Sequence, residues 1–192
     1  FFKKKIKFSL NSSLEAQLAS ISDDIAYNSH DLEDGLKSNL FKLKDLKKIP
    51  VLDKIIIKHI KKTKKYSIDL IIRQIIREII NEMVSDVILT TRKKIKINKI
   101  KNLNDVYKTK NQLVTFSDKM KIFDSKIKKF LKHKMYFHKK VNFKTNYGRK
   151  VINKLFKSIK QNPKKYIDIK KYNNPNLERI ICDYIAGMTD RY

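Results

Sequence analysis

Ser20-Ile-Ser-Asp-Asp-Ile-Ala-Tyr-Asn-Ser-His-Asp-Leu-Glu-Asp34, closed by Gly35, is the stretch that organises this chain. Because Ser12 and Glu15 have the spacing of a capping box and Gly35 is a common helix stop, the pattern predicts one helix over residues 12–34. At about 100° per residue, one side of this helix is apolar and is expected to face a core. That side carries Leu14, Leu18, Ile21, Ile25 and Leu32.

The opposite side of the same helix is unusual in a chain rich in Lys. It carries Asp23, Tyr27, His30, Asp31 and Asp34. Neighbouring carboxylates repel one another unless a cation or a hydrogen-bonding ligand offsets their charge. The polar side therefore predicts the wall of a binding site.

Helical spacing of apolar residues recurs along the rest of the chain, which has 192 residues, three Gly, three Pro and no Trp. Alternation of period two is absent over any useful length, so no sheet of consequence is expected. The expected helices cover residues 36–50, 50–60, 67–91, 118–135, 146–161 and 177–188. Between them, a polar connector over 92–117 is expected to be anchored to the core by Leu113-Val-Thr-Phe116. These patterns predict an all-α fold.

The formal net charge of +27 suits a nucleic acid, nucleotide phosphates or an anionic surface as a partner. Of the 46 basic residues only six are Arg, whereas readout of base edges favours Arg. A Lys-rich composition is also what an AT-rich genome encodes without selection for binding. The charge leaves open both a basic helical module that binds nucleic acid, including single strands, and a composition without function.

No apolar run reaches the length of about 18 residues that indicates a membrane span, so no membrane partner is expected. The start, Phe1-Phe-Lys-Lys-Lys5, has no initiator Met and no signal-peptide pattern, so it is expected to be the cut end of a longer cytoplasmic protein. The single cysteine, Cys182, excludes an internal disulfide, and its apolar neighbours predict a buried thiol.

Three blocks of sequence carry a resemblance to a known family. They are Ser22-Asp-Asp-Ile-Ala-Tyr-Asn-Ser-His-Asp-Leu-Glu-Asp-Gly35, then Phe130-Leu-Lys-His-Lys-Met-Tyr-Phe-His138 with Val141, and Ile181-Cys-Asp-Tyr-Ile-Ala-Gly-Met-Thr-Asp-Arg-Tyr192. In this order they resemble the deoxyguanosine triphosphate triphosphohydrolase (dGTPase) family of HD-domain phosphohydrolases. The resemblance implies the C-terminal half of an HD-domain-type bundle. Residues 1–48 would end the HD domain with its last metal-ligand helix, and 49–192 would form the phosphohydrolase-associated helical region.

The resemblance also implies roles for the polar side of the first helix. Asp23 would be the distant Asp that binds a divalent metal, Mg or Mn. Tyr27 would lie against the sugar and phosphates of a deoxynucleotide, and Asp31 would accept a hydrogen bond from the sugar 3′-hydroxyl. The shared helix face, derived above from spacing, agrees with these roles. Asp24 and Asp34 are expected to be general helix polarity.

A second group of implied substrate contacts lies downstream. Tyr136, His138 and Lys139 resemble the segment in which an aromatic ring packs under the deoxyribose. Lys128 aligns with a phosphate-binding cation, although an ordinary exposed Lys remains an equal alternative. Phe137 departs from the family, which more often carries a basic residue there. His59 and His133 are expected to be surface residues.

The sequence contains no His-Asp dipeptide other than His30-Asp31, which the resemblance assigns to another role. The first His and the adjacent His-Asp pair of the family's metal site are therefore absent from these 192 residues. The expected function is therefore that of a fragment of a dNTP triphosphohydrolase, which releases deoxynucleoside and triphosphate and is inactive by itself. Its expected partners are a dNTP and either further copies of the chain or a complementing upstream half that supplies the other metal ligands. An inactive gene remnant and the nucleic-acid-binding module described above are the alternatives.

Overall fold

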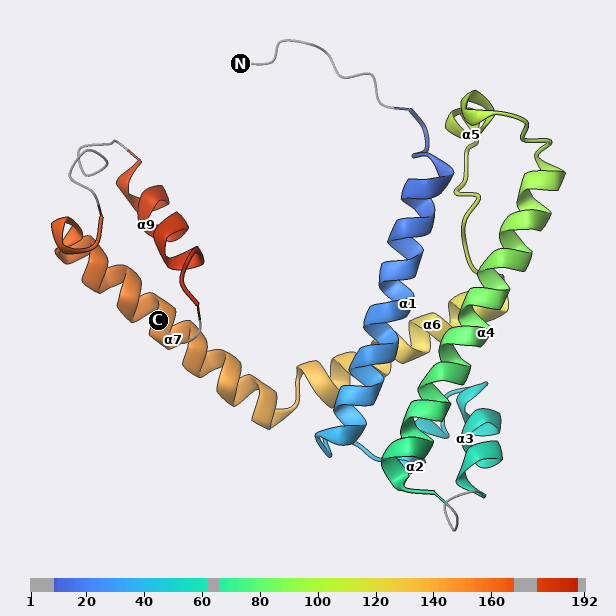
Figure 1. The fold of residues 1–192 in the computed structure, drawn as a ribbon, viewed down its shortest axis with the longest axis horizontal. Helices are drawn as coiled ribbons and strands as arrows, with labels where there is room; N and C mark the ends of the chain where they lie inside the picture. The colour runs from blue at the N-terminus through green and yellow to red at the C-terminus, as the bar shows by residue number, and fades with distance from the viewer. Residues whose placement is uncertain (1–8, 62–65, 168–175, 190–192) are drawn as a thin grey trace. The chain divides into compact units, whose positions relative to one another are not determined.

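A computed structural model describes residues 9–61, 66–167 and 176–189. All regular secondary structure in these ranges is helical, which confirms the predicted all-α class (Figure 1). The chain divides into two compact units, one ending at Tyr136 and the other beginning at Phe137. We call them unit 1 and unit 2 and describe each by itself. The predicted domain boundary between residues 48 and 49 stays a prediction.

Helix α1 (Leu14–Lys37) contains the organising stretch. Its N-cap is Ser13, whose side chain accepts a hydrogen bond from the Ala16 N–H at 3.3 Å, so the predicted cap at Ser12 was one residue early. The helix also continues through Gly35, which was predicted to end it. Gly35 is buried, and a Cβ added there would lie 2.2 Å from the Phe41 ring. The glycine is needed for close packing of α1 against Phe41.

The chain turns sharply after α1. Asn39 has a φ of 53°, and only the short helix α2 (Leu43–Leu46) follows, so the single helix predicted over 36–50 was wrong. Helix α3 (Leu52–Ile60) forms where a helix was expected. His59, predicted to lie on the surface, is buried and contacts the Glu78 carboxylate through Nε2.

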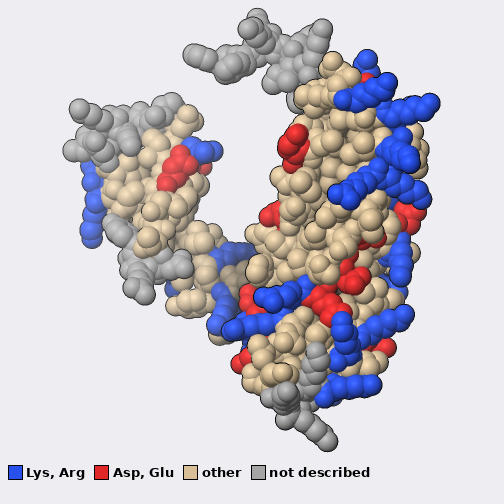
Figure 2. Space-filling model, turned by 45° about the vertical axis from the view of Figure 1, so that its right-hand side comes forward, with Lys and Arg blue, Asp and Glu red and all other residues tan. Residues whose placement is uncertain are grey.

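Helix α4 (Ile68–Ile97) is the longest helix of the described residues and begins at the N-cap Ser67. It runs six residues beyond the predicted end at residue 91. It packs against α1 and α3, and Figure 1 shows α1 and α4 side by side. The buried side chains that α4 contributes to the core of unit 1 are Ile71, Ile72, Ile75, Ile76, Ile79, Met83 and Val87. Lys and Arg side chains are spread over the surface of this unit, with Asp and Glu among them (Figure 2).

Helix α5 (Leu103–Lys108) follows, and the segment after it is anchored to the core as predicted. Leu113, Val114 and Phe116 are buried. The buried Gln17 of α1 fixes this segment, because its Oε1 accepts hydrogen bonds from the backbone N–H groups of Leu113 at 2.9 Å and Val114 at 3.1 Å.

Helix α6 (Asp118–Leu131) crosses α1 and ends in a π-helical turn, η1 (Lys132–Tyr136). At its start, the backbone N–H and the hydroxyl of Ser117 donate to the Asp86 carboxylate at 2.7 and 2.6 Å. Asp86 of α4 therefore holds the start of α6 against α4.

Unit 2 contains α7 (Lys139–Gln161), the 3₁₀ turn η2 (Pro163–Lys165) and α9 (Leu177–Ala186). Its small core is formed by Ile159, Ile167 and Ile181. Cys182 on α9 is exposed, so the prediction of a buried thiol was wrong. Within the described residues, no helix has the length and apolar character needed to cross a membrane. The first five residues, and the last three of the C-terminal block, lie outside the described ranges.

Candidate nucleotide site on helix α1

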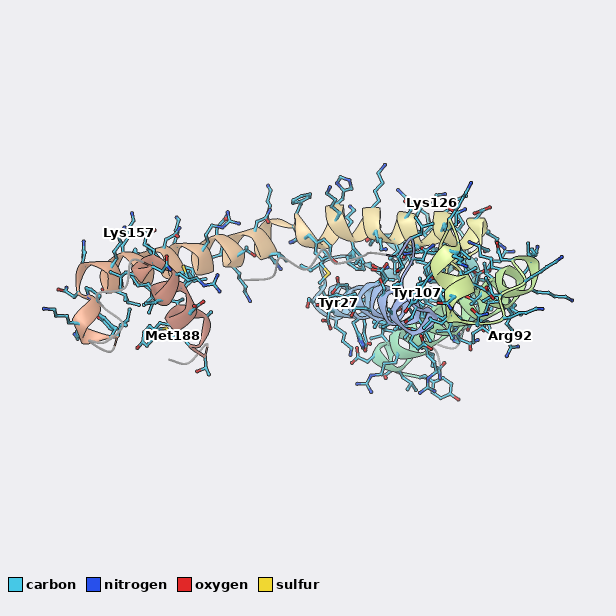
Figure 3. The ribbon with its side chains drawn as sticks, turned by 90° about the horizontal axis from the view of Figure 1, so that it is seen from above. Tyr27, Arg92, Tyr107, Lys126, Lys157 and Met188 are labelled. Carbon is cyan, nitrogen blue, oxygen red and sulfur yellow. The ribbon has the colours of Figure 1, made fainter. Side chains whose placement is uncertain are left out.

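The two sides of α1 meet different surroundings, as the spacing predicted, except that Leu18, predicted to face the core, is 51% exposed. Ile25 and Leu32 are buried on one side. On the other side Asp23, His30 and Asp34 are exposed, Tyr27 is 65% exposed and Asp31 is half-buried. Figure 3 marks Tyr27 on α1. The polar side thus remains accessible to a ligand.

A hydrogen bond joins this polar side to the end of α6. The Tyr136 hydroxyl donates to Oδ2 of Asp31, which lies 105 positions earlier. Partial burial of the phenol, this hydrogen bond and the negative charge of Asp31 raise the pKa of Tyr136 to about 12, and nearby Tyr27 adds to the effect. The phenol is therefore protonated at neutral pH and donates the hydrogen bond. The structure thus brings Tyr27, Asp31 and Tyr136 together.

Lys128 lies between two carboxylates where α6 passes α1. Its Nζ is 3.0 Å from Oδ2 of Asp24 and 3.0 Å from Oδ2 of Asp124. Although partial burial acts to lower it, the pKa of Lys128 is raised by the hydrogen bonds to Asp124 and Asp24. The ammonium group is thus firmly charged. Asp24, predicted to be general helix polarity, instead pairs with Lys128 of α6.

A buried amide completes this group. Nδ2 of Asn28, a residue only 6% exposed, donates to Oδ1 of Asp124 at 2.8 Å. Asp124 therefore accepts from α1 with one oxygen and from Lys128 with the other. We call Asp24, Asn28, Asp124 and Lys128 the α1–α6 polar cluster.

Sequence reasoning did not identify Asn28 and Asp124. Asn28 falls between Ile25 and Leu32 on the apolar side of the helix, and a polar residue there signals a buried hydrogen-bond partner. Asp124 and Lys128 have the ordinary spacing of a helical ion pair, which by itself indicates no site. The link between the two helices is visible only in the structure.

His138 and Lys139 belong to unit 2. His138 is the N-cap of α7, where its Nδ1 accepts a hydrogen bond from the Lys140 N–H at 3.2 Å. This bond requires an unprotonated Nδ1. Lys139 is exposed at the first position of α7. The role of both residues as substrate contacts stays a prediction. His133 is exposed, as predicted.

Asp23 can supply one ligand to a divalent cation. Its side chain is exposed and forms no hydrogen bond or ion pair with the described residues. The ranges that the structure describes contain no group of three or more His, Cys, Asp or Glu side chains placed to hold a metal ion. Divalent cations in proteins require several such donors. The described residues therefore do not fit a complete metal site.

Comparison with known proteins gives two kinds of match. The family model of the phosphohydrolase-associated domain matches residues 114–192. A protein of Pelagibacter ubique is 46% identical over 191 residues, which cover 100% of this chain and 51% of that protein. Proteins of Bartonella henselae and Bartonella tribocorum are 33% and 31% identical, with 99% and 93% of this chain covered.

Each of the three relatives is named a deoxyguanosinetriphosphate triphosphohydrolase-like protein. The matched region is 49% of the length of the B. henselae protein and 46% of the B. tribocorum protein. The chain thus spans about half the length of the curated relatives that it matches.

Proposed function

We propose that the chain is the C-terminal portion of a phosphohydrolase similar to the deoxyguanosinetriphosphate triphosphohydrolase-like proteins, and that it forms part of a dNTP triphosphohydrolase site. The observation that carries the proposal is the hydrogen bond from Tyr136 to Asp31. This bond joins the sequence block around Asp31 to the block around Tyr136, and each block was assigned to the deoxynucleotide separately. The bond lies on an accessible face of α1, beside Tyr27.

The chemistry of this group suits a deoxyribose. Oδ2 of Asp31 accepts from Tyr136, and a carboxylate has a second oxygen that can accept from a sugar 3′-hydroxyl. In our proposal, the Tyr136 ring packs under the sugar, where a 2′-hydroxyl would have no room, and Tyr27 lies along the sugar and phosphates. Because the carboxylate is fixed by the phenol, its free oxygen has a defined direction.

We assign the phosphates to Lys128, whose side chain is 44% exposed and whose charge is firmly held. Asp24 and Asp124 orient the ammonium group, and a phosphate oxygen would approach its exposed side. Lys139 and His138 of unit 2 are further proposed contacts. Asp23 would give one carboxylate to a Mg or Mn ion whose other ligands come from outside the described residues.

The proposed reaction is hydrolysis of the bond between the α-phosphorus and the 5′ oxygen. A water oxygen bonds to the α-phosphorus, the 5′ oxygen leaves with a proton, and the products are deoxynucleoside and triphosphate. The 192-residue chain is proposed to be inactive by itself. It acts together with a complementing upstream half or with further copies of itself in an oligomer. The protein is proposed to be cytoplasmic.

The test is a chimera in which this chain replaces the matched half of the Pelagibacter ubique relative. Triphosphate release from dGTP, with Mg²⁺ or Mn²⁺, is measured for the chimera, for the chain alone and for the unchanged relative. We expect release by the chimera and the relative and none by the chain alone. Release by the chain alone would contradict the proposed division of the site, and a folded chimera that is silent beside an active relative would contradict the function.

A further inference from the structure

A cavity of about 580 Å³ lies at the far end of α4, away from the polar side of α1. It is bounded by the last turns of α4, by α5 and by the segment that returns to the core at Leu113. Figure 3 shows α5, marked by Tyr107, beside the last part of α4, marked by Arg92. Every residue of this cavity belongs to unit 1.

Four of the residues that line this cavity are Lys94, Lys99, Lys108 and Lys110. Among the described residues, none of the four forms an ion pair. Asp105 is the single acidic residue of the lining, and its carboxylate already accepts from the backbone N–H groups of Lys101 at 2.9 Å and Asn102 at 3.2 Å. The lining therefore carries more positive than negative charge, although the carboxylate of Asp118 also acts on Lys94. Several Lys and Arg side chains gather over this end of unit 1 in Figure 2.

Lys94 is the most enclosed of the four. It is half-buried, and its Nζ donates to the Gln112 carbonyl at 3.0 Å, which uses one of three donor hydrogens. Partial burial and the positive charge of Lys121 lower the pKa of Lys94, and the negative charge of Asp118 opposes them in part. An anion in the cavity would offset both effects and accept the remaining hydrogens.

Lys99, another residue of the lining, has a backbone conformation that is unfavourable for a residue with a side chain. Its φ is 50°, and it follows Asn98, the C-cap of α4. The N–H of Lys99 donates to the Lys96 carbonyl and that of Ile100 to the Ile95 carbonyl, the paired bonds of a Schellman motif. This position favours Gly, because residues with a side chain rarely adopt a positive φ. Lys99 is exposed and is one of the four Lys residues of the lining.

The Lys-rich composition alone does not explain this lining. A second cavity, of about 670 Å³ between α3, α4 and α6, is lined by three Lys and four Asp or Glu residues. It lies in the same unit and has the opposite balance of charge. The excess of Lys over acidic residues is therefore not shared by every cavity of unit 1.

We propose that this cavity binds an oligophosphate anion. Several closely spaced phosphate groups match ammonium groups that surround one space, and each phosphate oxygen can accept a charge-assisted hydrogen bond. Inorganic triphosphate and the triphosphate group of a nucleotide share this chemistry. The binding is independent of the reaction proposed above.

The test is calorimetric titration of the 192-residue chain with inorganic triphosphate. The variant Lys108→Gln/Lys110→Gln removes two exposed charges from the cavity, and Lys54→Gln/Lys119→Gln removes two exposed charges from the second cavity. A hydrogen bond to a charged group is worth about 1.5–3 kcal/mol, so the first variant should weaken binding by at least about tenfold. The matched control should change it by less than about twofold. Equal losses in both variants, or no saturable binding, would overturn the proposal.

Two further sets of measurements distinguish a nucleotide from a free oligophosphate as the ligand, and this cavity from other binding sites. Stronger binding of dGTP than of inorganic triphosphate, lost in Lys108→Gln/Lys110→Gln, would identify a nucleotide as the ligand, and equal binding would identify the free oligophosphate. Loss of binding only in Lys128→Gln would assign the anion to the α1–α6 polar cluster and contradict the proposal. Binding of single-stranded DNA without binding of triphosphate would also contradict it.

Discussion

The Tyr136 hydroxyl donates a hydrogen bond to the Asp31 carboxylate across 105 positions of sequence. Asp31 comes from the middle of α1, and Tyr136 is the last residue of the turn that ends α6. The bond therefore fixes the end of α6 against the polar side of α1. It also fixes one oxygen of the carboxylate that we assign to the sugar.

The first prediction concerns the pH dependence of stability. The folded chain raises the pKa of Tyr136 from 10.0 to about 12, so it holds the phenolic proton more tightly than the unfolded chain does. The resulting stability is complete below pH 10.0 and is lost as the pH rises from 10.0 to about 12. In urea unfolding, Tyr136→Phe should show a smaller loss than the wild type over this range. Asp31→Asn, which removes the charge of the acceptor, should also reduce the loss, and parallel profiles for all three proteins would refute the prediction.

The second prediction compares two glycines within helices. A Cβ at Gly35 would lie 2.2 Å from the buried Phe41 ring, which packs edge-on against Phe130 at 4.9 Å and cannot easily move. Overpacking of this kind costs about 1–3 kcal/mol, so Gly35→Ala should lower the free energy of unfolding in spite of the better helix propensity of Ala.

Gly148 in α7 is the matched control, because a Cβ there would meet nothing within 4 Å. Gly148→Ala should stabilise the chain by roughly 0.5–1 kcal/mol. Urea unfolding followed by circular dichroism gives both values. A neutral or stabilising effect of Gly35→Ala would contradict the packing described for α1.

The third prediction concerns the α1–α6 polar cluster. Asp124→Ala leaves the buried Asn28 amide without its acceptor and takes one of two carboxylates from Lys128. An unpaired buried polar group costs about 1–3 kcal/mol, and the free energy of unfolding should fall by that amount. The neighbouring exposed Ser125→Ala should change it by less than about 0.5 kcal/mol. Similar values for the two variants would show that the cluster does not hold the helices together.

Periodicity predicted most helices of this chain because their apolar faces are continuous in sequence. It placed α3 and most of α4 and α6, and the anchor at 113–116. It failed where a tertiary contact decides the outcome. Gly35 resembles a helix stop until Phe41 is packed against it, and His59 resembles a surface residue until Glu78 lies beside it.

The candidate site could be predicted only in part for the same reason. The shared face of Asp23, Tyr27 and Asp31 follows from helical geometry. The meeting of Asp31 with Tyr136, and of Asp24 with Lys128, depends on how α6 crosses α1, which no local pattern specifies. Tyr136 and Lys128 were named as site residues only through the family resemblance.

The most direct test of the central claim uses Asp→Asn substitutions in the chimera with the Pelagibacter ubique relative. Asp23 and Asp34 are both exposed on α1, and only Asp23 is proposed to bind the metal. Triphosphate release from dGTP and binding of Mn²⁺ are measured for Asp23→Asn and Asp34→Asn. The account predicts that Asp23→Asn abolishes release and weakens Mn²⁺ binding, while Asp34→Asn changes neither by more than about twofold. Release by Asp23→Asn at a rate close to that of Asp34→Asn would contradict it.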